Sequence, residues 1–127
     1  MTTLENKEFV RKYLEALSGK PKPASVVDRY VSEQMLKDHI AGAEAGFPEY
    51  ILDPVEMVAE GDKVSVKARL KGTHLGVFNG IPATGREVDL LFHITYQIRD
   101  GKIIDHWMLI DGMEMMQQLG LIPQPAG

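Results

Sequence analysis

The chain has 127 residues, of which 44% are hydrophobic and 25% charged, and this is typical of one globular domain, here residues 1–127. Its formal net charge of −4 does not supply the basic face that nucleic-acid binding needs, and no apolar run is long enough to span a membrane. No signal-peptide pattern is visible and there is no cysteine, so we expect a cytoplasmic protein that uses no thiol chemistry and binds neither nucleic acid nor membranes.

Three helices are predicted in the first part of the chain. The first has apolar residues at helical spacing and ends before Gly19 and Pro21. A short second helix carries Val26 and Tyr30. Ser32 is the predicted N-cap of a third helix. The apolar stripe of that third helix consists of Met35, Leu36, His39 and Ile40.

From about Pro54 onward the apolar residues recur with a period of two, which is the period of a β-strand. We predict four strands, at residues 55–60, 63–71, 87–98 and 102–110, followed by a short helix at residues 112–119. The second strand alternates cleanly between apolar and polar residues, which is typical of an antiparallel sheet with one face exposed. Helices followed by such strands predict an α+β fold with a concave space between the two layers.

All four histidines lie on elements that should face this concave space. His39 belongs to the stripe of the third helix, and His74 has the inward parity of the second strand if that strand continues without a bulge. His93 and His106 lie within apolar strands. A polar group that is buried without a partner costs about 1–3 kcal/mol, so each ring should either hydrogen-bond within the core or line a polar cavity. We expect at least two of the rings to share a cavity.

The register of the last hairpin decides which side chains share a face with His93. If residues 100–101 belong to a three-residue loop with Gly101 in the left-handed conformation, His93 lies opposite Trp107. In this register His93 shares a face with Asp105 and Asp111.

A two-residue type I′ turn at the same place moves the pairing by one position. His93 then lies opposite Met108 and shares a face with His106. We favour the three-residue loop, because its bulge needs a positive φ at Gly101 alone.

Two of the aspartates have structural interpretations beside the catalytic ones. Asp111 is followed three residues later by Glu114, which is the spacing of a capping box at the start of the last helix. It is therefore predicted as a helix cap, as a general acid or base, or as both. Asp105 is either an acid/base candidate or a cross-strand partner of Thr95.

Apolar residues on the last two strands have two interpretations as well. Tyr96, Trp107 and Met108 belong either to the core or to the wall of a site for a flat apolar ligand. The sequence contains no glycine-rich phosphate loop, no HExxH metal motif and no GxSxG nucleophile motif. We therefore expect neither a metal nor a cofactor.

Three segments carry a resemblance to a known family. They read AEGDKV at residues 59–64, GTHLGVFNGIPATGREV at residues 72–88 and DGKIIDHW at residues 100–107. In this order, within a core of about residues 5–122, they resemble the SnoaL-like polyketide and ester cyclases of the nuclear transport factor 2-like superfamily. The resemblance implies a cone-shaped curved antiparallel sheet wrapped over about three N-terminal helices, with a short C-terminal helix. It also implies a deep pocket and a homodimer formed through the outer face of the sheet.

The resemblance further implies an activity. Family cyclases close a ring by intramolecular aldol condensation without metal or cofactor, using a carboxylate and a histidine on the long strands as an acid/base pair. The candidates for this pair are His93, His106, Asp105 and Asp111. Many relatives carry aspartate at two further strand positions, where this chain has Ile94 and Met108, which makes its pocket less acidic.

The leading hypothesis is a cofactor-free cyclase, isomerase or lyase that acts next to a carbonyl group on a flat apolar substrate, polyketide-like or an ester. A placed base or acid contributes about 10²–10⁴ to the rate of such a proton transfer. The alternatives are a non-catalytic binder of a small hydrophobic ligand and a dimeric scaffold of the same fold. The residues predicted to contact the substrate are His39, His74, Trp107, Met108 and Tyr96.

Overall fold

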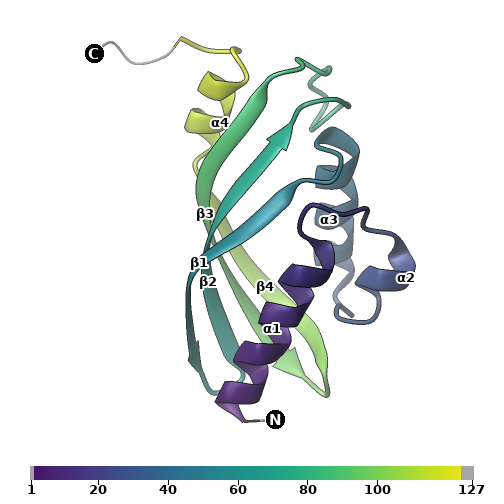
Figure 1. Ribbon diagram of the computed structural model, residues 1–127, viewed down its shortest axis with the longest axis vertical. Helices are drawn as coiled ribbons and strands as arrows, with labels where there is room; N and C mark the ends of the chain where they lie inside the picture. Colours follow the sequence, from purple (N-terminus) through teal and green to yellow (C-terminus); the bar gives the residue numbers. More distant parts are fainter. Residues whose placement is uncertain (1, 124–127) are drawn as a thin grey trace.

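The computed structural model describes residues 2–123. Its helices are α1 (Thr3–Leu17), α2 (Ala24–Val27), α3 (Gln34–Gly46) and α4 (Gly112–Gln118). Its strands are β1 (Ile51–Glu60), β2 (Lys63–Thr73), β3 (Glu87–Arg99) and β4 (Lys102–Ile110). Figure 1 shows one strongly curved sheet with α1, α2 and α3 on its concave side and α4 near its upper end. The predicted α+β fold is confirmed.

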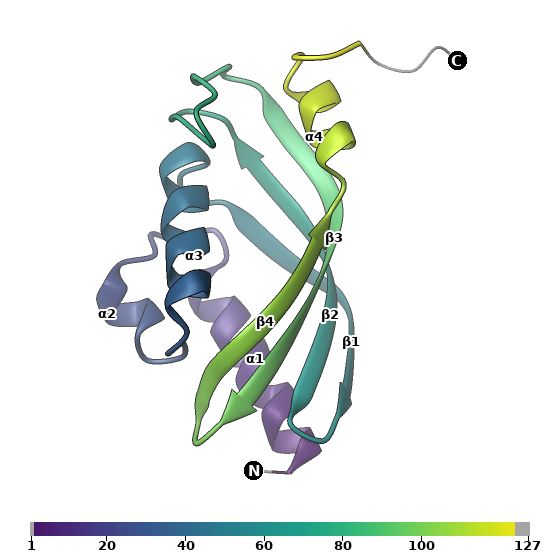
Figure 2. The same cartoon turned by 180° about the vertical axis from the view of Figure 1, so that it is seen from behind.

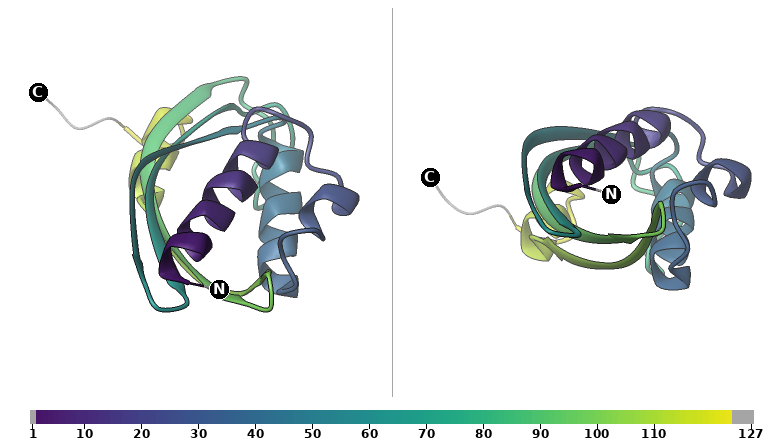
Figure 3. Two further views of the ribbon diagram at one scale, coloured as in Figure 1. Left: turned by 60° about the horizontal axis from the view of Figure 1, so that its bottom comes forward. Right: turned by 90° about the horizontal axis from the view of Figure 1, so that it is seen from below.

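The four strands form an antiparallel meander in the order β1-β2-β3-β4. Side chains along β3 alternate strictly between buried and accessible, as expected for a sheet that covers a core on one face only. Viewed from below, the sheet curves around α1 (Figure 3). No helix among residues 2–123 is long and apolar enough to cross a membrane.

The space between α1 and the sheet is filled by side chains. Tyr13 on α1 meets Tyr96 on β3 edge to face, with 5.5 Å between the ring centroids. Burial raises the pKa of both phenols. Leu14 and Leu17 of α1 and Ile98 of β3 are also buried. This part of the concave space is therefore solid core.

Helix α3 is attached to the rest of the molecule at both of its ends. At its start, Val31 forms a parallel β-bridge with Ile103 of β4, and the amide of Ser32 donates to the carbonyl of Ile103 at 3.0 Å. At its end, the carbonyl of Gly46 accepts from the amides of Leu75 and Gly76. These backbone contacts fix α3 relative to β4 and to the loop after β2.

The N-cap predicted for α3 is wrong by one residue. Glu33 occupies the cap position with extended backbone angles, and its side chain makes no capping hydrogen bond. The hydroxyl of Ser32 donates to the carbonyl of Ile103 instead. Because the chain before α3 pairs with β4, Ser32 is drawn toward the strand and the helix begins one residue later.

The last hairpin combines features of both predicted registers. Arg99 pairs with Lys102 around a two-residue turn, and both turn residues have positive φ, so the favoured three-residue loop is wrong. A bulge at Ile104 then adds one unpaired residue to β4. His93 lies opposite Leu109 as a result, and the bulge restores the face assignment that the three-residue loop predicted.

Most element boundaries agree with the sequence. β1 begins at Ile51, four residues before the predicted start, and β2 continues to Thr73. β4 has the predicted bounds, and α4 ends one residue earlier than expected. The first helix starts at Thr3, because Thr2 forms a capping box with Glu5.

Candidate functional site

His106 is the buried centre of a polar cluster at the edge of the sheet. It lies on the inward face of β4, opposite Tyr96. Its side chain is 3% exposed, and its Nδ1 hydrogen-bonds to Oε1 of Glu33. A carboxylate can only accept, so this contact places a proton on Nδ1 of the ring.

The other ring nitrogen of His106 contacts His39 on α3. Nε2 of His106 lies 3.3 Å from Nδ1 of His39, and the rings meet edge to face with 5.3 Å between centroids. When Nδ1 of a neutral His106 carries the proton, its Nε2 accepts, and Nδ1 of His39 is then the donor. His39 is an exposed residue, so its Nε2 remains as an acceptor near solvent.

The backbone explains why Glu33 reaches His106. The bridge between Val31 and Ile103 holds the start of α3 against β4, three residues before His106 on the strand. The side chain of Glu33 is free to turn toward the strand, because it does not cap its own helix. Asp105 adds a second carboxylate, whose Oδ1 accepts from the backbone amide of His106 at 2.8 Å.

Glu33, Asp105 and His106 are also the described residues best placed to hold a cation. They offer one ligand atom each, and these atoms lie within 4.8 Å of one another. In the structure these residues hydrogen-bond among themselves, Nδ1 of His106 to Glu33 and the carboxylate of Asp105 to a backbone amide. The polar side chains of this cluster form a hydrogen-bonded network and therefore have hydrogen-bond partners without a cation.

An open apolar surface adjoins this network. Met108 follows His106 on the inward face of β4 and is 44% exposed, whereas its cross-strand partner Ile94 is 4% exposed. The helices therefore leave this part of β4 uncovered. Figure 2 shows α3 standing beside this edge of the sheet. Gly42 lies one turn after His39 on the same side of α3, and a Cβ there would meet no atom within 4 Å.

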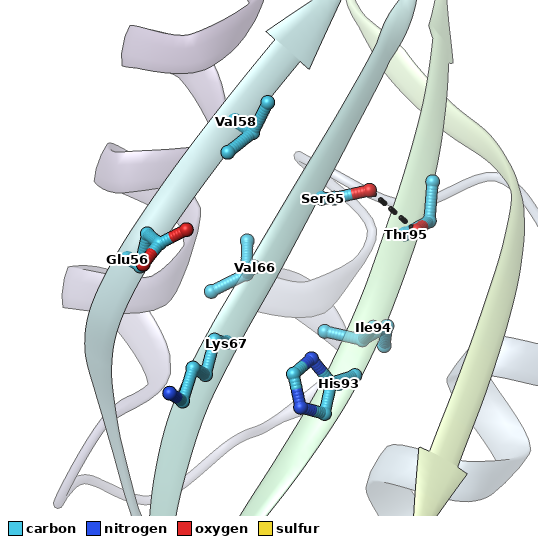
Figure 4. Close-up of a pocket in the computed structure, with 8 residues that line it drawn as sticks. All are labelled: Glu56, Val58, Ser65, Val66, Lys67, His93, Ile94 and Thr95. Carbon is cyan, nitrogen blue, oxygen red and sulfur yellow. Dashed lines mark hydrogen bonds between the residues drawn. The ribbon is translucent and has the colours of Figure 1, made fainter.

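His93 does not join the network, and the expectation that it faces the interior is wrong. Strand alternation places it on the outer face of the sheet, where it is exposed. Figure 4 shows it in a shallow hollow with Glu56 and Lys67, beside Thr95. Trp107 lies on the same outer face and is exposed, so the structure does not place it beside His106 or His39.

His74 has the predicted inward orientation but is completely buried. Its Nδ1 accepts from the backbone amide of Thr84 at 3.2 Å, and its ring stacks on Phe47 with 5.1 Å between centroids. Its Nε2 has no hydrogen-bond partner among the described residues. The ring thus holds the loop at residues 75–85 closed. Tyr96, the other buried candidate for substrate contact, belongs to the core beside Tyr13.

The two candidate aspartates, Asp105 and Asp111, have different partners in the structure. Asp111 is the N-cap of α4, and its carboxylate accepts from the amide of Glu114 at 3.0 Å, which confirms the capping interpretation. The predicted pairing of Asp105 with Thr95 is wrong, because the hydroxyl of Thr95 bonds to that of Ser65 at 2.7 Å. Asp105 contacts the amide of His106 instead.

The hollows found on the described residues do not bring two histidines together. One hollow lies around His93 on the outer face, and another lies beside Asn6 and Asp100 near the lower end of the sheet. The first contains His93 as its one histidine, and the second, lined by Asn6 of α1 and Ile98 of β3, contains none. Two of the four rings, those of His39 and His106, meet by direct contact instead.

Comparison with known proteins decides the family. The family model described as SnoaL-like polyketide cyclase matches residues 8–119. The chain belongs to the SnoaL-like polyketide cyclase family. No curated protein sequence gives a match.

Solved structures share the SnoaL-like fold at low sequence identity. AclR from Streptomyces galilaeus, described as a putative hydroxylase, is 22% identical with a TM-score of 0.82, covering 98% of this chain and 87% of that chain. A putative SnoaL-like polyketide cyclase from Jannaschia sp. CCS1 is 23% identical with a TM-score of 0.81 and 95% coverage of both chains. TsrD from Streptomyces laurentii is 21% identical with a TM-score of 0.80, covering 96% of this chain and 99% of that chain.

Within this SnoaL-like fold, sequence reasoning missed Glu33. It lies 73 residues from His106 in the sequence, and no motif links the two. The available signal was its place directly before the third predicted helix, next to Ser32. A carboxylate at the start of a helix is usually explained by its favourable interaction with the helix dipole. The sequence therefore provides no reason to assign Glu33 a contact with a distant strand.

Proposed function

We propose that this SnoaL-like protein is a cofactor-independent cytoplasmic enzyme that moves a proton next to a carbonyl group of a flat apolar substrate. The reaction would be an aldol cyclisation, an isomerisation or a dehydration of a polyketide-like or ester compound. The observation that carries the proposal is the exposed imidazole of His39, which is hydrogen-bonded to the buried His106 beside the uncovered Met108. Family membership over residues 8–119 supports the same reaction class.

The chemistry common to these reactions is formation of an enolate. A base takes the proton from the carbon next to the carbonyl, and the electrons of the broken C–H bond move onto the carbonyl oxygen. The enolate then attacks a second carbonyl, is reprotonated elsewhere, or expels a leaving group. A correctly placed imidazole accelerates the first step by about 10²–10⁴.

The apolar pair Ile94 and Met108 supports an imidazole as the base. At these two positions, by the resemblance, many relatives carry aspartate, and the positions face each other on β3 and β4. With no carboxylate at either position, the imidazole pair of His39 and His106 supplies the candidate base next to the open surface of β4.

Solvent deuterium uptake tests the proposal without knowledge of the natural substrate. The protein is incubated in D2O with 2-tetralone, 1-phenylbutane-1,3-dione or an aryl acetoacetate ester, and deuterium at the α-carbon is followed by NMR. We expect exchange above the buffer rate that falls by about 10²–10⁴ in the double variant His39→Gln, His106→Gln. Binding of these compounds without any exchange by the folded protein would contradict the proposal and indicate a non-catalytic binder.

We also propose that two copies of the chain pair through the outer face of the sheet. This face carries apolar side chains that the single chain leaves exposed, namely Val58, Trp107 and Leu109, of which Leu109 is 74% exposed. Trp107 and Leu109 are neighbours on this face of β4, and exposed apolar patches are typical of interaction surfaces.

A further inference from the structure

We propose that Glu33, His106 and His39 form a proton relay in which Nε2 of His39 exchanges the proton with the substrate and Glu33 acts as a positioning residue. This inference rests on the proposed function and assigns roles within it. Neither the family resemblance nor the motifs of the chain point to Glu33.

His106 is excluded as the group that touches the substrate. Its side chain is 3% exposed, and both ring nitrogens are engaged, Nδ1 by Glu33 and Nε2 by His39. A general base must reach the proton that it removes, directly or through one water molecule. His106 can therefore act only through a neighbour, and the neighbour that reaches solvent is His39.

The hydrogen bonds fix the tautomers of the two rings. Ionised Glu33 has no proton to donate, so Nδ1 of His106 carries one. Nε2 of the neutral ring is then an acceptor, and Nδ1 of His39 supplies the proton between them. Of the two proton-free ring nitrogens, Nε2 of His106 is engaged by His39, and Nε2 of His39 keeps a free lone pair on an exposed residue.

Proton transfer through this relay balances without a further reactant. The C–H bond of the substrate breaks, its proton joins Nε2 of His39, and its electron pair becomes the enolate. The proton on Nδ1 of His39 passes to Nε2 of His106, so the positive charge comes to rest on His106. The reverse movement returns a proton to the product, and the relay ends in its starting state.

The surroundings of His106 favour the charged intermediate. The imidazolium would be hydrogen-bonded to the carboxylate of Glu33, and a carboxylate oxygen of Asp105 lies within 4.8 Å of a ring nitrogen. Hydrogen bonds between ionised partners are stronger than those between neutral ones. His39 alone, on the exposed side of α3, would have to hold the positive charge in solvent.

The tautomers are tested first, and this test needs no substrate. Two-dimensional ¹⁵N NMR of the labelled protein reports which nitrogen of each neutral ring carries the proton. We expect the proton on Nδ1 in both His106 and His39. A neutral His39 protonated on Nε2 would overturn the relay, whatever the catalytic activity.

Catalysis is tested with substitutions at Glu33 and a matched control on the same helix. Glu33→Gln keeps an acceptor oxygen but removes the charge, Glu33→Asp keeps the charge, and Asp38→Asn removes an exposed charge that bonds only to Gln34 among the described residues. We expect Glu33→Gln to lower kcat for α-deuterium exchange by about tenfold or more with KM nearly unchanged. Glu33→Asp should recover part of the loss, and Asp38→Asn should stay near wild type.

The outcomes separate the relay from the proposed function. Wild-type exchange together with an undiminished kcat in a folded Glu33→Gln variant would overturn the relay and leave the function standing. An equal loss in Asp38→Asn would also overturn it, because the effect would then be one of net charge. No exchange by the wild type would contradict the function, while the NMR measurement would still decide the tautomers.

Discussion

Ile94 and Met108 face each other across β3 and β4 on the inward side of the sheet, yet one is buried and the other is 44% exposed. Strand pairing thus brings together the two positions at which, by the resemblance, many relatives carry aspartate. The helices therefore cover β3 at Ile94 but leave β4 exposed at Met108. The proposed site adjoins this exposed part of β4, next to His106.

Aspartate at these two positions should therefore affect stability very differently. Met108→Asp places the charge at an open surface, and we expect the free energy of unfolding to fall by no more than about 1 kcal/mol. Ile94→Asp buries an unpaired carboxylate and should cost several kcal/mol or prevent folding. Urea unfolding of both variants measures the difference, and equal losses would show that the helices cover Met108 as well.

Two glycines of α3 should respond to alanine with opposite signs. A Cβ at Gly42 meets no atom within 4 Å, so Gly42→Ala should stabilise the protein by up to about 1 kcal/mol through helix propensity. A Cβ at Gly46 would lie 2.7 Å from the Cβ of Phe78, so Gly46→Ala should destabilise it. Thermal unfolding of the matched pair tests the placement of α3.

The cap of the last helix gives a test that separates structure from catalysis. Asp111→Ala should cost about 1 kcal/mol of stability, because the amide of Glu114 loses its acceptor, whereas Asp111→Asn should keep the cap. We expect α-deuterium exchange by Asp111→Asn to match that of the wild type. A large loss of exchange with unchanged stability would instead restore the catalytic role predicted from the sequence.

Buried phenols should make the protein less stable at alkaline pH. Burial raises the pKa of Tyr13 and of Tyr96 above their ordinary value of 10.0. The unfolded chain therefore loses these protons first, and the stability that they contribute is present below about pH 10 and lost as the pH rises above it. Burial raises the pKa of Tyr50 as well, and it lowers the pKa of Lys22, which acts in the opposite direction but is one group against three.

Urea unfolding between about pH 9 and pH 11 measures this dependence. Tyr96→Phe should flatten the decline relative to the wild type, because the variant has one phenol fewer to ionise on unfolding. Tyr30→Phe is the matched control, since Tyr30 packs beside Tyr13 but is only partly buried. An equally steep decline in Tyr96→Phe and the wild type would contradict this explanation.

The proposed pairing of two chains is tested on the outer face. Leu109→Glu introduces a charge at an exposed position that a dimer would bury, and sedimentation should then show a monomer. Leu4→Glu on α1 is the control, since Leu4 is equally apolar and exposed but lies on a different element. A wild-type protein that is monomeric at high concentration would refute the pairing.

Elements specified by neighbouring residues could be predicted from the sequence. The alternation along residues 63–71 and the spacing of Asp111 and Glu114 act within a few positions, and both are realised in the structure. The bulge at Ile104 could not be predicted, because it depends on how β4 pairs with β3 and bridges to Val31. That single extra residue decides that His93 faces outward while His106 faces inward.

The candidate site was predicted only in part, for the same reason. His39 and His106 were recognised as candidates because imidazoles on apolar faces are unusual. Their contact with each other and with Glu33 joins segments that are 67 and 73 residues apart. Local sequence patterns hold no information on such contacts, so the contact of Glu33 with His106 became visible only in the structure.

The central claim is that proton transfer occurs at His39 on the helix side of the sheet. The most direct measurement compares α-deuterium uptake by the wild type, His39→Gln and His93→Gln in D2O. We predict that uptake is lost in His39→Gln by a factor of about 10² or more and is retained in His93→Gln. Uptake that persists in His39→Gln and disappears in His93→Gln would contradict the account.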